Sequence, residues 1–190
     1  MSALDSLRKQ DGLLLVDVQN DFCSGGVLPI PDGDAVVPML NRWIEAARRK
    51  KAAIYASRDW HPIRHVSFRE EGGKWPPHCL ADTRGAEFHP GLMLPGDVVK
   101  ITKGVRLDKD QNSAFDETGL EVFLKRKGIR RLWVGGLAED ICVLASIFEA
   151  LRAGFAVNVI ADAVRPVFPK GGKEAATCML AAGATMIVEE

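Results

Sequence analysis

The chain has 190 residues, 47% of them apolar, which is enough to form a core, so we expect a single domain over residues 1–190. It carries 25 basic and 25 acidic residues, and without a basic surplus we do not expect nucleic acid as a partner. No stretch approaches the roughly 20 apolar residues of a membrane helix and no signal-peptide pattern appears, so we expect a cytoplasmic protein without membrane association.

Short apolar or β-branched runs, which predict β-strands, alternate along the chain with helical patterns. The six runs cover residues 12–18, 52–57, 97–102, 131–136, 156–161 and 184–189. Between them, apolar residues repeat with helical spacing over 36–47, 141–151 and 176–183. Strands separated by helices are typical of a parallel sheet covered on both faces. We therefore predict an α/β protein with a three-layer α/β/α, Rossmann-like fold and a six-stranded parallel sheet.

Residues 59–96 interrupt this alternation. They are rich in His, Pro, Gly and Trp and show no clear period. So long a loop in a compact domain is usually functional or disordered, and its aromatic content argues against disorder. The first predicted strand is not followed by a GxGxxG fingerprint, which disfavours a dinucleotide-dependent oxidoreductase.

Unusual polar residues stand at the carboxyl ends of the first four predicted strands. They are Asp17, Asp59, His61, Lys103 and, after the turn GGLAEDIC, Cys142. In an open parallel sheet, ligands bind beyond these strand ends. We therefore expect one cleft there.

Cys142 is predicted to lie in the first turn of the helix at 141–151, where unpaired N–H groups favour the thiolate and could hold an oxyanion. A small buried core residue is the alternative interpretation. Asp17 ends an apolar strand, so it is either a functional carboxylate or a cap of the next loop. Lys103 is either a surface lysine or a charge partner of the other two.

A second cluster lies in the loop after the second strand. In an extended segment, positions two apart point the same way, so Asp59 and His61 can ligate one ion while His78 returns from the loop. Two imidazoles and a carboxylate suit Zn²⁺, with Mn²⁺ or Fe²⁺ as alternatives, although they could also hydrogen-bond without a metal. His65 is a candidate further ligand or a residue that holds the loop, whereas His89 is expected to be structural.

Seven segments of the chain resemble the isochorismatase-like cysteine hydrolases, and among them the nicotinamidase (pyrazinamidase) group. They are DVQNDFCSGG (17–26), RDWHPIRHVSF (58–68), WPPHC (75–79), EFHPG (87–91), ITKG (101–104), SAF (113–115) and GLAEDICV (136–143). Their common order makes the resemblance specific over nearly the whole chain.

The resemblance implies an amidohydrolase that converts nicotinamide to nicotinate and ammonia through a cysteine thioester, and that also accepts pyrazinamide. It implies a catalytic trio of Asp17, Lys103 and Cys142. It also implies one divalent metal ion that holds the pyridine nitrogen, with Asp59, His61 and His78 as ligands.

The same resemblance extends to the walls of the site. Phe22 and Trp75 match the positions that sandwich the substrate ring. Ala138 and Cys142 match the backbone N–H donors of an oxyanion hole, with a cis peptide between Leu137 and Ala138.

The chain departs from the family pattern in the segment DKDQNSAF (108–115). Gln111 and Asn112 stand where we expect a serine and an aromatic residue. Because this loop leads away from Lys103, the change is expected at the rim of the pocket. Substrate choice is therefore less defined by the resemblance than the type of reaction.

Other interpretations of the same residues remain. A sibling hydrolase would act on another small amide, an N-carbamoyl compound or isochorismate. A non-haem iron oxygenase could use two histidines and a carboxylate, but such enzymes usually have an all-β fold. A binding protein without activity is a further alternative. Besides a small-molecule amide, the sequence leaves a homo-oligomeric partner open.

Overall fold

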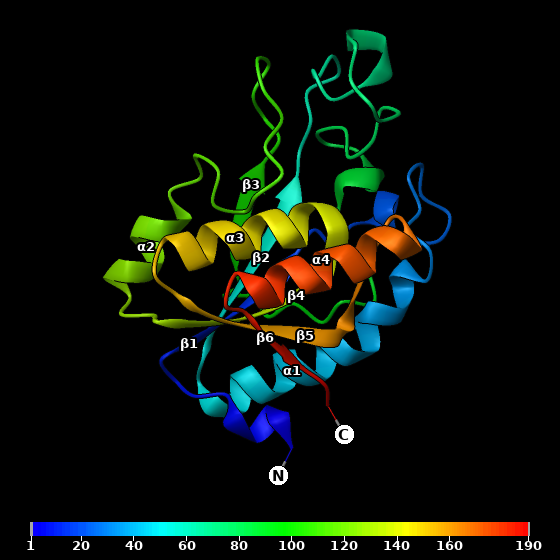
Figure 1. The fold of residues 1–190 in the computed structure, drawn as a ribbon. Helices are drawn as coiled ribbons and strands as arrows, with labels where there is room; N and C mark the ends of the chain where they lie inside the picture. Colours follow the sequence, from blue (N-terminus) through cyan, green and yellow to red (C-terminus); the bar gives the residue numbers. More distant parts are fainter. Residues whose placement is uncertain (1, 190) are drawn as a thin grey trace.

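The computed structural model describes residues 2–189, in which six strands form one sheet with the order β3-β2-β1-β4-β5-β6 (Figure 1). The strands are β1 Asp11–Val16, β2 Ala53–Asp59, β3 Val99–Lys103, β4 Arg131–Leu137, β5 Ala156–Arg165 and β6 Thr185–Ile187. Every neighbouring pair is parallel. The predicted six-stranded parallel sheet is confirmed.

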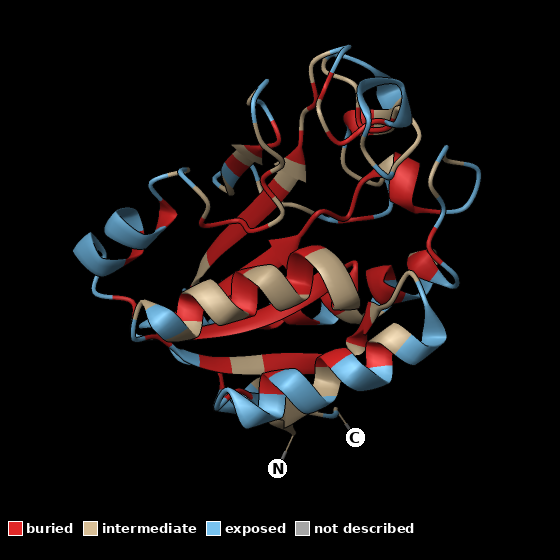
Figure 2. Cartoon of the chain, turned by 45° about the horizontal axis from the view of Figure 1, so that its top comes forward, coloured by how far each residue is buried: buried red, intermediate tan, exposed pale blue. Residues whose placement is uncertain are grey.

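Helices cover both faces of this sheet. They are α1 Val36–Lys50, α2 Leu120–Arg126, α3 Leu144–Arg152 and α4 Pro169–Ala181. Alternate residues of β1 point to opposite faces of the sheet. Leu13 and Leu15 pack into the core under α1. Leu14 and Val16 pack into the core that α2, α3 and α4 cover. The inner strands β1, β2 and β4 are accordingly buried along most of their length, whereas the edge strands β3 and β6 are more exposed. Exposed residues also lie on the outer sides of the helices (Figure 2). This is the predicted three-layer fold.

The element boundaries differ from the predicted ones where the apolar pattern is weak. The short helix α2 has only two buried residues, Leu120 and Leu124, which are too few to form a visible stripe. Helix α4 begins at Pro169, before the predicted range. The apolar pattern did not reveal its first turns, because their segment PKGGKE has no apolar residue besides the proline. No helix within residues 2–189 is both long and apolar enough to cross a membrane.

The predicted helix at 141–151 begins with an irregular turn. Residues Glu139–Val143 form a π-type turn, in which the Val143 N–H donates to the Ala138 carbonyl at 3.0 Å, and α3 follows from Leu144. The peptide bond between Leu137 and Ala138 is cis, as the resemblance implied. Cys142 therefore lies in a widened turn before the regular helix.

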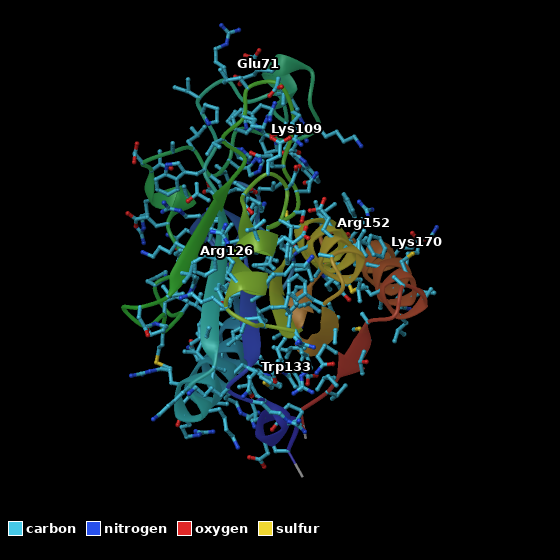
Figure 3. All side chains as sticks on the ribbon, turned by 90° about the vertical axis from the view of Figure 1, so that its left-hand side faces the viewer. Glu71, Lys109, Arg126, Trp133, Arg152 and Lys170 are labelled. Atoms are coloured by element: carbon cyan, nitrogen blue, oxygen red, sulfur yellow. The ribbon has the colours of Figure 1, made fainter. Side chains whose placement is uncertain are left out.

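Two long loops rise at the carboxyl end of the sheet. The segment between β2 and β3 contains only short 3-10 turns, η4 Arg69–Glu71 and η5 Arg84–Ala86. Figure 3 shows Glu71 from this segment and Lys109 from the loop after β3 at the same end of the molecule, while Trp133 of β4 lies toward the other end. The remaining 3-10 turns are η1 Ala3–Ser6, η2 Asn20–Phe22 and η3 Gly33–Ala35.

Candidate active site

The candidate site lies where the order of the strands reverses. From β1 the chain moves outward through β2 to β3, and it then returns to β4 on the other side of β1. Asp17 directly follows β1, and the turn that carries Cys142 directly follows β4. Such a switch point opens a crevice at the carboxyl ends of the strands.

Three side chains capable of acid–base and nucleophilic chemistry meet in this crevice. Lys103 Nζ lies 2.8 Å from Asp17 Oδ2 and 3.6 Å from Cys142 Sγ. The hydroxyl of Ser57 donates to Asp17 Oδ1 at 2.7 Å and so fixes the orientation of the carboxylate. Asp17 and Lys103 are fully buried, whereas Cys142 lines the adjoining cavity. Of the three, only Cys142 lines the cavity.

The backbone at the ends of β1 and β4 lets these three side chains come together. Asp17 has a φ of +47°, a left-handed conformation that turns the chain sharply at the end of β1. Gly136 has a φ of +130°, and a Cβ there would collide with the backbone of Val16. Only glycine lets the two strand ends lie this close.

The charges of the trio are strongly coupled. Burial raises the pKa of the Cys142 thiol well above its usual range, although the ammonium of Lys103 opposes this shift. Burial also raises the pKa of Asp17, again against the charge of Lys103. For Lys103, burial alone would lower the pKa, but the carboxylates of Asp17 and Asp59 raise it well above its usual range.

These shifts bear on how the thiol of Cys142 loses its proton. Burial disfavours the thiolate at Cys142, whereas the ammonium of Lys103 favours it. Its neighbour Asp17 has a raised pKa and is therefore a stronger base than an exposed carboxylate. Lys103 stays charged, beside any negative charge that forms on the sulfur.

Asp59, His61 and His78 form a second buried group next to the trio. Their ligand atoms lie within 4.8 Å of one another. Nδ1 of His61 donates to the Gly104 carbonyl, and Nδ1 of His78 donates to the Pro76 carbonyl, each at 2.8 Å. Because a carbonyl can only accept, Nδ1 of each ring carries a proton, which leaves Nε2 as the ring nitrogen available to a metal.

The carboxylate of Asp59 is shared between the two groups. Its Oδ1 accepts from Lys103 Nζ at 2.5 Å, while its Oδ2 lies 3.7 Å from His61 Nε2. Lys103 holds the pKa of Asp59 low despite its burial. Two free imidazole nitrogens and an ionised carboxylate oxygen are a donor set that fits a divalent transition metal.

His65 stands beside this group without joining it. Its ring stacks on that of His61 with 4.1 Å between the ring centroids, and its Nδ1 lies 2.8 Å from Ser67 Oγ. The set of ligand atoms within 4.8 Å of one another does not include His65. Its buried Nε2 has no hydrogen-bond partner among the described residues. The stacking and the Ser67 contact support a role in holding the loop.

A cavity connects the trio with the metal-type group. Phe22 and Trp75, the expected ring-binding residues, both line it, and the ring of Phe22 lies 5.5 Å from that of His78. Ala138 also lines it. Asn112, whose departure from the family pattern was expected at the rim of the pocket, lines it too. The other lining residues, which the sequence did not single out for this role, are Leu28, Ile30, Asp110, Ile141 and Val167. Apolar residues such as Leu28 carry no sequence signal that separates a cavity wall from a core.

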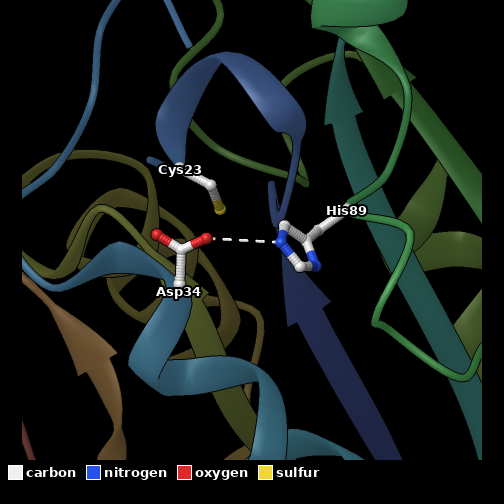
Figure 4. A group of neighbouring side chains, drawn as sticks. All are labelled: Cys23, Asp34 and His89. Carbon is white, nitrogen blue, oxygen red and sulfur yellow. Dashed lines mark ion pairs between the residues drawn. The ribbon is translucent and has the colours of Figure 1, made fainter. Parts of the chain in front are cut away.

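His89 forms a separate group with Cys23 and Asp34 (Figure 4). His89 Nε2 lies 3.3 Å from Asp34 Oδ1, and its Nδ1 accepts from the Gly91 N–H at 3.1 Å. Burial, followed by the charge of Asp34, raises the pKa of Cys23 to about 12. With both ring nitrogens engaged and the thiol protonated, this group ties loops together, in line with the expected structural role of His89.

Fold and site define a doubly wound α/β protein with a buried Asp–Lys–Cys cluster beside a metal-type ligand set. A model of the isochorismatase domain family matches residues 11–190. The nicotinamidase of Escherichia coli K12 is 39% identical to this chain, with 92% of each covered. The chain belongs to the isochorismatase domain family.

Solved structures give the same result. The pyrazinamidase of Pyrococcus horikoshii, determined in complex with zinc, is 41% identical and has a TM-score of 0.91, with 94% of this chain and 99% of that chain covered. PnC1 from L. infantum, determined in complex with nicotinate, is 33% identical with a TM-score of 0.88, covering 95% of this chain and 93% of that one. The predicted fold and the family resemblance are both confirmed.

Proposed function

We propose that the protein is an amidohydrolase that converts nicotinamide to nicotinate and ammonia, and that it also hydrolyses pyrazinamide. The observation that carries this proposal is the meeting of Asp17, Lys103 and Cys142 with the buried donors Asp59, His61 and His78 at one cavity. The relatives support it, because they include a nicotinamidase, a pyrazinamidase with zinc and a structure with nicotinate.

In the first half of the reaction, Asp17 accepts the thiol proton of Cys142 while the sulfur attacks the carboxamide carbon. The carbonyl electron pair moves to the oxygen, and the N–H groups of Ala138 and Cys142 hold the resulting oxyanion. When the tetrahedral intermediate collapses, the C–N bond breaks and the proton on Asp17 leaves with the nitrogen as ammonia. A thioester on Cys142 remains.

In the second half, water loses a proton to Asp17 and attacks the thioester carbon. The C–S bond breaks, the acid leaves, and the proton returns from Asp17 to the sulfur. Lys103 keeps its charge throughout, because Asp59 stays ionised beside it while Asp17 takes up and returns the proton. It therefore stabilises each state in which Cys142 is anionic.

The metal-type group gives the cavity its preference for an aromatic nitrogen. Asp59, His61 and His78 would hold one divalent ion, for which Zn²⁺ is our first choice and Mn²⁺ or Fe²⁺ the alternatives. When bound, the ion supplies an open coordination position for the lone pair of a ring nitrogen. Phe22 and Trp75 line the same cavity, where their rings can pack on the two faces of the substrate ring.

A sibling reaction on another small amide, an N-carbamoyl compound or isochorismate would use the same trio. It gives no role to the buried group of Asp59, His61 and His78. An ammonia-release assay on nicotinamide, pyrazinamide and an N-carbamoyl amino acid separates the two, with direct detection of isochorismate cleavage beside it.

The same assay after chelation and metal replacement tests the metal-type group. We expect nicotinamide hydrolysis to fall on chelation and to return with Zn²⁺, Mn²⁺ or Fe²⁺. Hydrolysis of the N-carbamoyl compound or isochorismate alone, independent of metal, would contradict the proposal.

A further inference from the structure

Gln19 has no role in the proposed reaction, yet its side chain is fully buried against Asp59. Its amide holds the backbone of Asp59 on both sides. Nε2 donates to the Asp59 carbonyl at 2.7 Å, and Oε1 accepts from the Asp59 N–H at 2.8 Å. Nε2 also donates to the Ala86 carbonyl at 2.8 Å. One side chain thus fixes both peptide groups of a residue in the metal-type group and ties them to the turn η5.

Asp59 needs this support because its carboxylate serves two neighbours. Oδ1 accepts from Lys103 Nζ at 2.5 Å, and Oδ2 lies 3.7 Å from His61 Nε2. A shift of the backbone that preserves one of these contacts changes the other, because the two oxygens are rigidly joined. The backbone of Asp59 must therefore be fixed if its carboxylate is to reach an ion and the lysine together.

Asp21, from the same turn η2, acts on the two histidines of the group. Its carboxylate is buried, and Oδ2 accepts from the Cys79 N–H at 2.7 Å. Cys79 directly follows His78, and its carbonyl accepts from the His61 N–H at 2.9 Å. Cys79 has a φ of +46°, a left-handed conformation that persists only when the surrounding structure supports it. Asp21 therefore holds a residue that joins the backbones of both histidines.

The surroundings of Asp21 leave its carboxylate little freedom. A Cβ at Gly85 would lie 2.2 Å from Asp21 Oδ2, so the turn η5 closes directly over it. The other oxygen accepts from the Val27 N–H at a long 3.4 Å. Burial of a carboxylate is unfavourable unless specific contacts compensate for it. The short contact with Cys79 is the stronger of the two, and it points to the support of the histidine loop as the role of this charge.

We propose that Gln19 and Asp21 are positioning residues for the metal-type group. Gln19 sets the place of the carboxylate ligand, and Asp21 sets the place of the two imidazoles, so the whole donor set depends on one short segment after β1. The next residue, Phe22, lines the cavity, so the same segment places a cavity wall relative to the ion. This inference rests on the proposed function, because it takes the three donors as ligands of one divalent ion.

The test measures Zn²⁺ affinity by isothermal titration calorimetry and the d–d absorption of the Co²⁺-loaded protein, which reports the coordination geometry. Gln19→Met keeps the length of the side chain and changes no charge, but removes the hydrogen bonds to Asp59 and Ala86. We expect its Kd for Zn²⁺ to rise about tenfold to a hundredfold and its Co²⁺ spectrum to change. Thermal melts establish the temperature at which each variant is folded.

Asp21→Ala and Asp21→Asn separate the hydrogen bond from the charge. Both remove the negative charge, but only the asparagine can still accept from the Cys79 N–H. We expect Asp21→Ala to weaken Zn²⁺ binding by at least about tenfold and Asp21→Asn to restore most of the affinity. Equal weakening in both would reveal an effect of charge alone and overturn the role of Asp21. If Gln19→Met does not fold, this pair of variants decides the proposal.

Asn41→Leu is the matched control, because its amide also holds backbone groups from both sides. Nδ2 of Asn41 donates to the Gly91 carbonyl at 2.8 Å, and Oδ1 accepts from the Met93 N–H at 2.9 Å. Neither partner belongs to the metal-type group. Asn41→Leu should lower the melting temperature but leave the Zn²⁺ affinity and the Co²⁺ spectrum unchanged.

The outcomes separate this inference from the proposed function. Zn²⁺ affinities within about twofold of the parent value in folded Gln19→Met and Asp21→Ala, with unaltered Co²⁺ spectra, would overturn the positioning role. A parent protein that binds no Zn²⁺ would overturn it as well. A parent protein that binds Zn²⁺ but does not hydrolyse nicotinamide would overturn the proposed function alone.

Discussion

At the scale of single residues, the site depends on one buried lysine that serves two groups. Lys103 Nζ contacts Asp17, Asp59 and Cys142 at 2.8, 2.5 and 3.6 Å. It keeps Asp59 ionised for a metal and balances the charge that moves between Asp17 and the sulfur. Two buried carboxylates this close to a thiol would be strongly unfavourable without it. The reaction centre and the metal-type group are therefore one electrostatic unit.

Asp17→Asn tests the proposed base at this scale. The amide keeps the size of the side chain and can still accept from Ser57, but it cannot take the proton of Cys142. We expect kcat for nicotinamide to fall by about a thousandfold or more. The melting temperature should also fall, because the variant loses a buried ion pair with Lys103, so activity is compared at a temperature at which the melting curve shows the variant folded. Asp32→Asn is the matched control, because Asp32 has a similar φ of +54° but is exposed. Full activity of Asp17→Asn would rule out Asp17 as the base.

At the scale of elements, the turn after β3 positions a ligand of the metal-type group. Gly104 has a φ of +69°, and a Cβ there would lie 2.5 Å from Cε1 and 2.6 Å from Nδ1 of His61. Its carbonyl accepts from His61 Nδ1. The strand that delivers Lys103 thus also fixes the orientation of His61.

Gly104→Ala should displace the His61 ring and weaken Zn²⁺ binding by about tenfold to a hundredfold. The strained φ and the collision should also lower the free energy of unfolding by about 1–3 kcal/mol. Isothermal titration calorimetry and thermal melts measure the two effects. Gly96→Ala should change neither, since a Cβ at Gly96 meets open space. Unaltered Zn²⁺ affinity in Gly104→Ala would show that the turn does not position His61.

The elements also show how far sequence reasoning reaches. Asp17 and Lys103 were predictable as strand-end residues, because apolar runs mark strands and the ends of parallel strands share one edge. The widened turn before α3 was not, since an i to i+5 hydrogen bond leaves no periodic signal. The place of Asp110 in the cavity wall was not predictable either, because the loop after β3 has no periodic apolar pattern. Phe22 and Trp75 came from the family resemblance and not from any spacing.

At the scale of the whole molecule, the packing of the sheet makes the stability of the fold decrease at alkaline pH. Tyr55, the only tyrosine of the chain, is 1% exposed in the core under α2. Burial raises its pKa above the ordinary value of about 10. The folded state thus keeps a proton that the unfolded chain releases. The corresponding stability is complete below pH of about 10 and is lost as the pH rises through the folded-state pKa.

Tyrosinate absorbance reports this titration directly, because no second tyrosine contributes. We expect the absorbance to rise near pH 10 in concentrated guanidinium chloride, about as for a free tyrosine, and only at higher pH or with unfolding in the native protein. In the parent protein, the free energy of unfolding should fall as the pH rises from the unfolded-state to the folded-state pKa of Tyr55. This fall should be smaller in Tyr55→Phe. Identical titration curves for native and unfolded protein would show that Tyr55 is not buried.

The most direct test of the account is ammonia release from nicotinamide by the Zn²⁺-loaded protein and by its Cys142→Ala variant. Cys142 is the residue of the trio that lines the cavity, and the thioester forms on its sulfur in the proposed reaction. We predict that the parent protein releases ammonia and nicotinate in equal amounts, and that the variant is slower by at least about a thousandfold. Release at the parent rate from the variant would contradict the account.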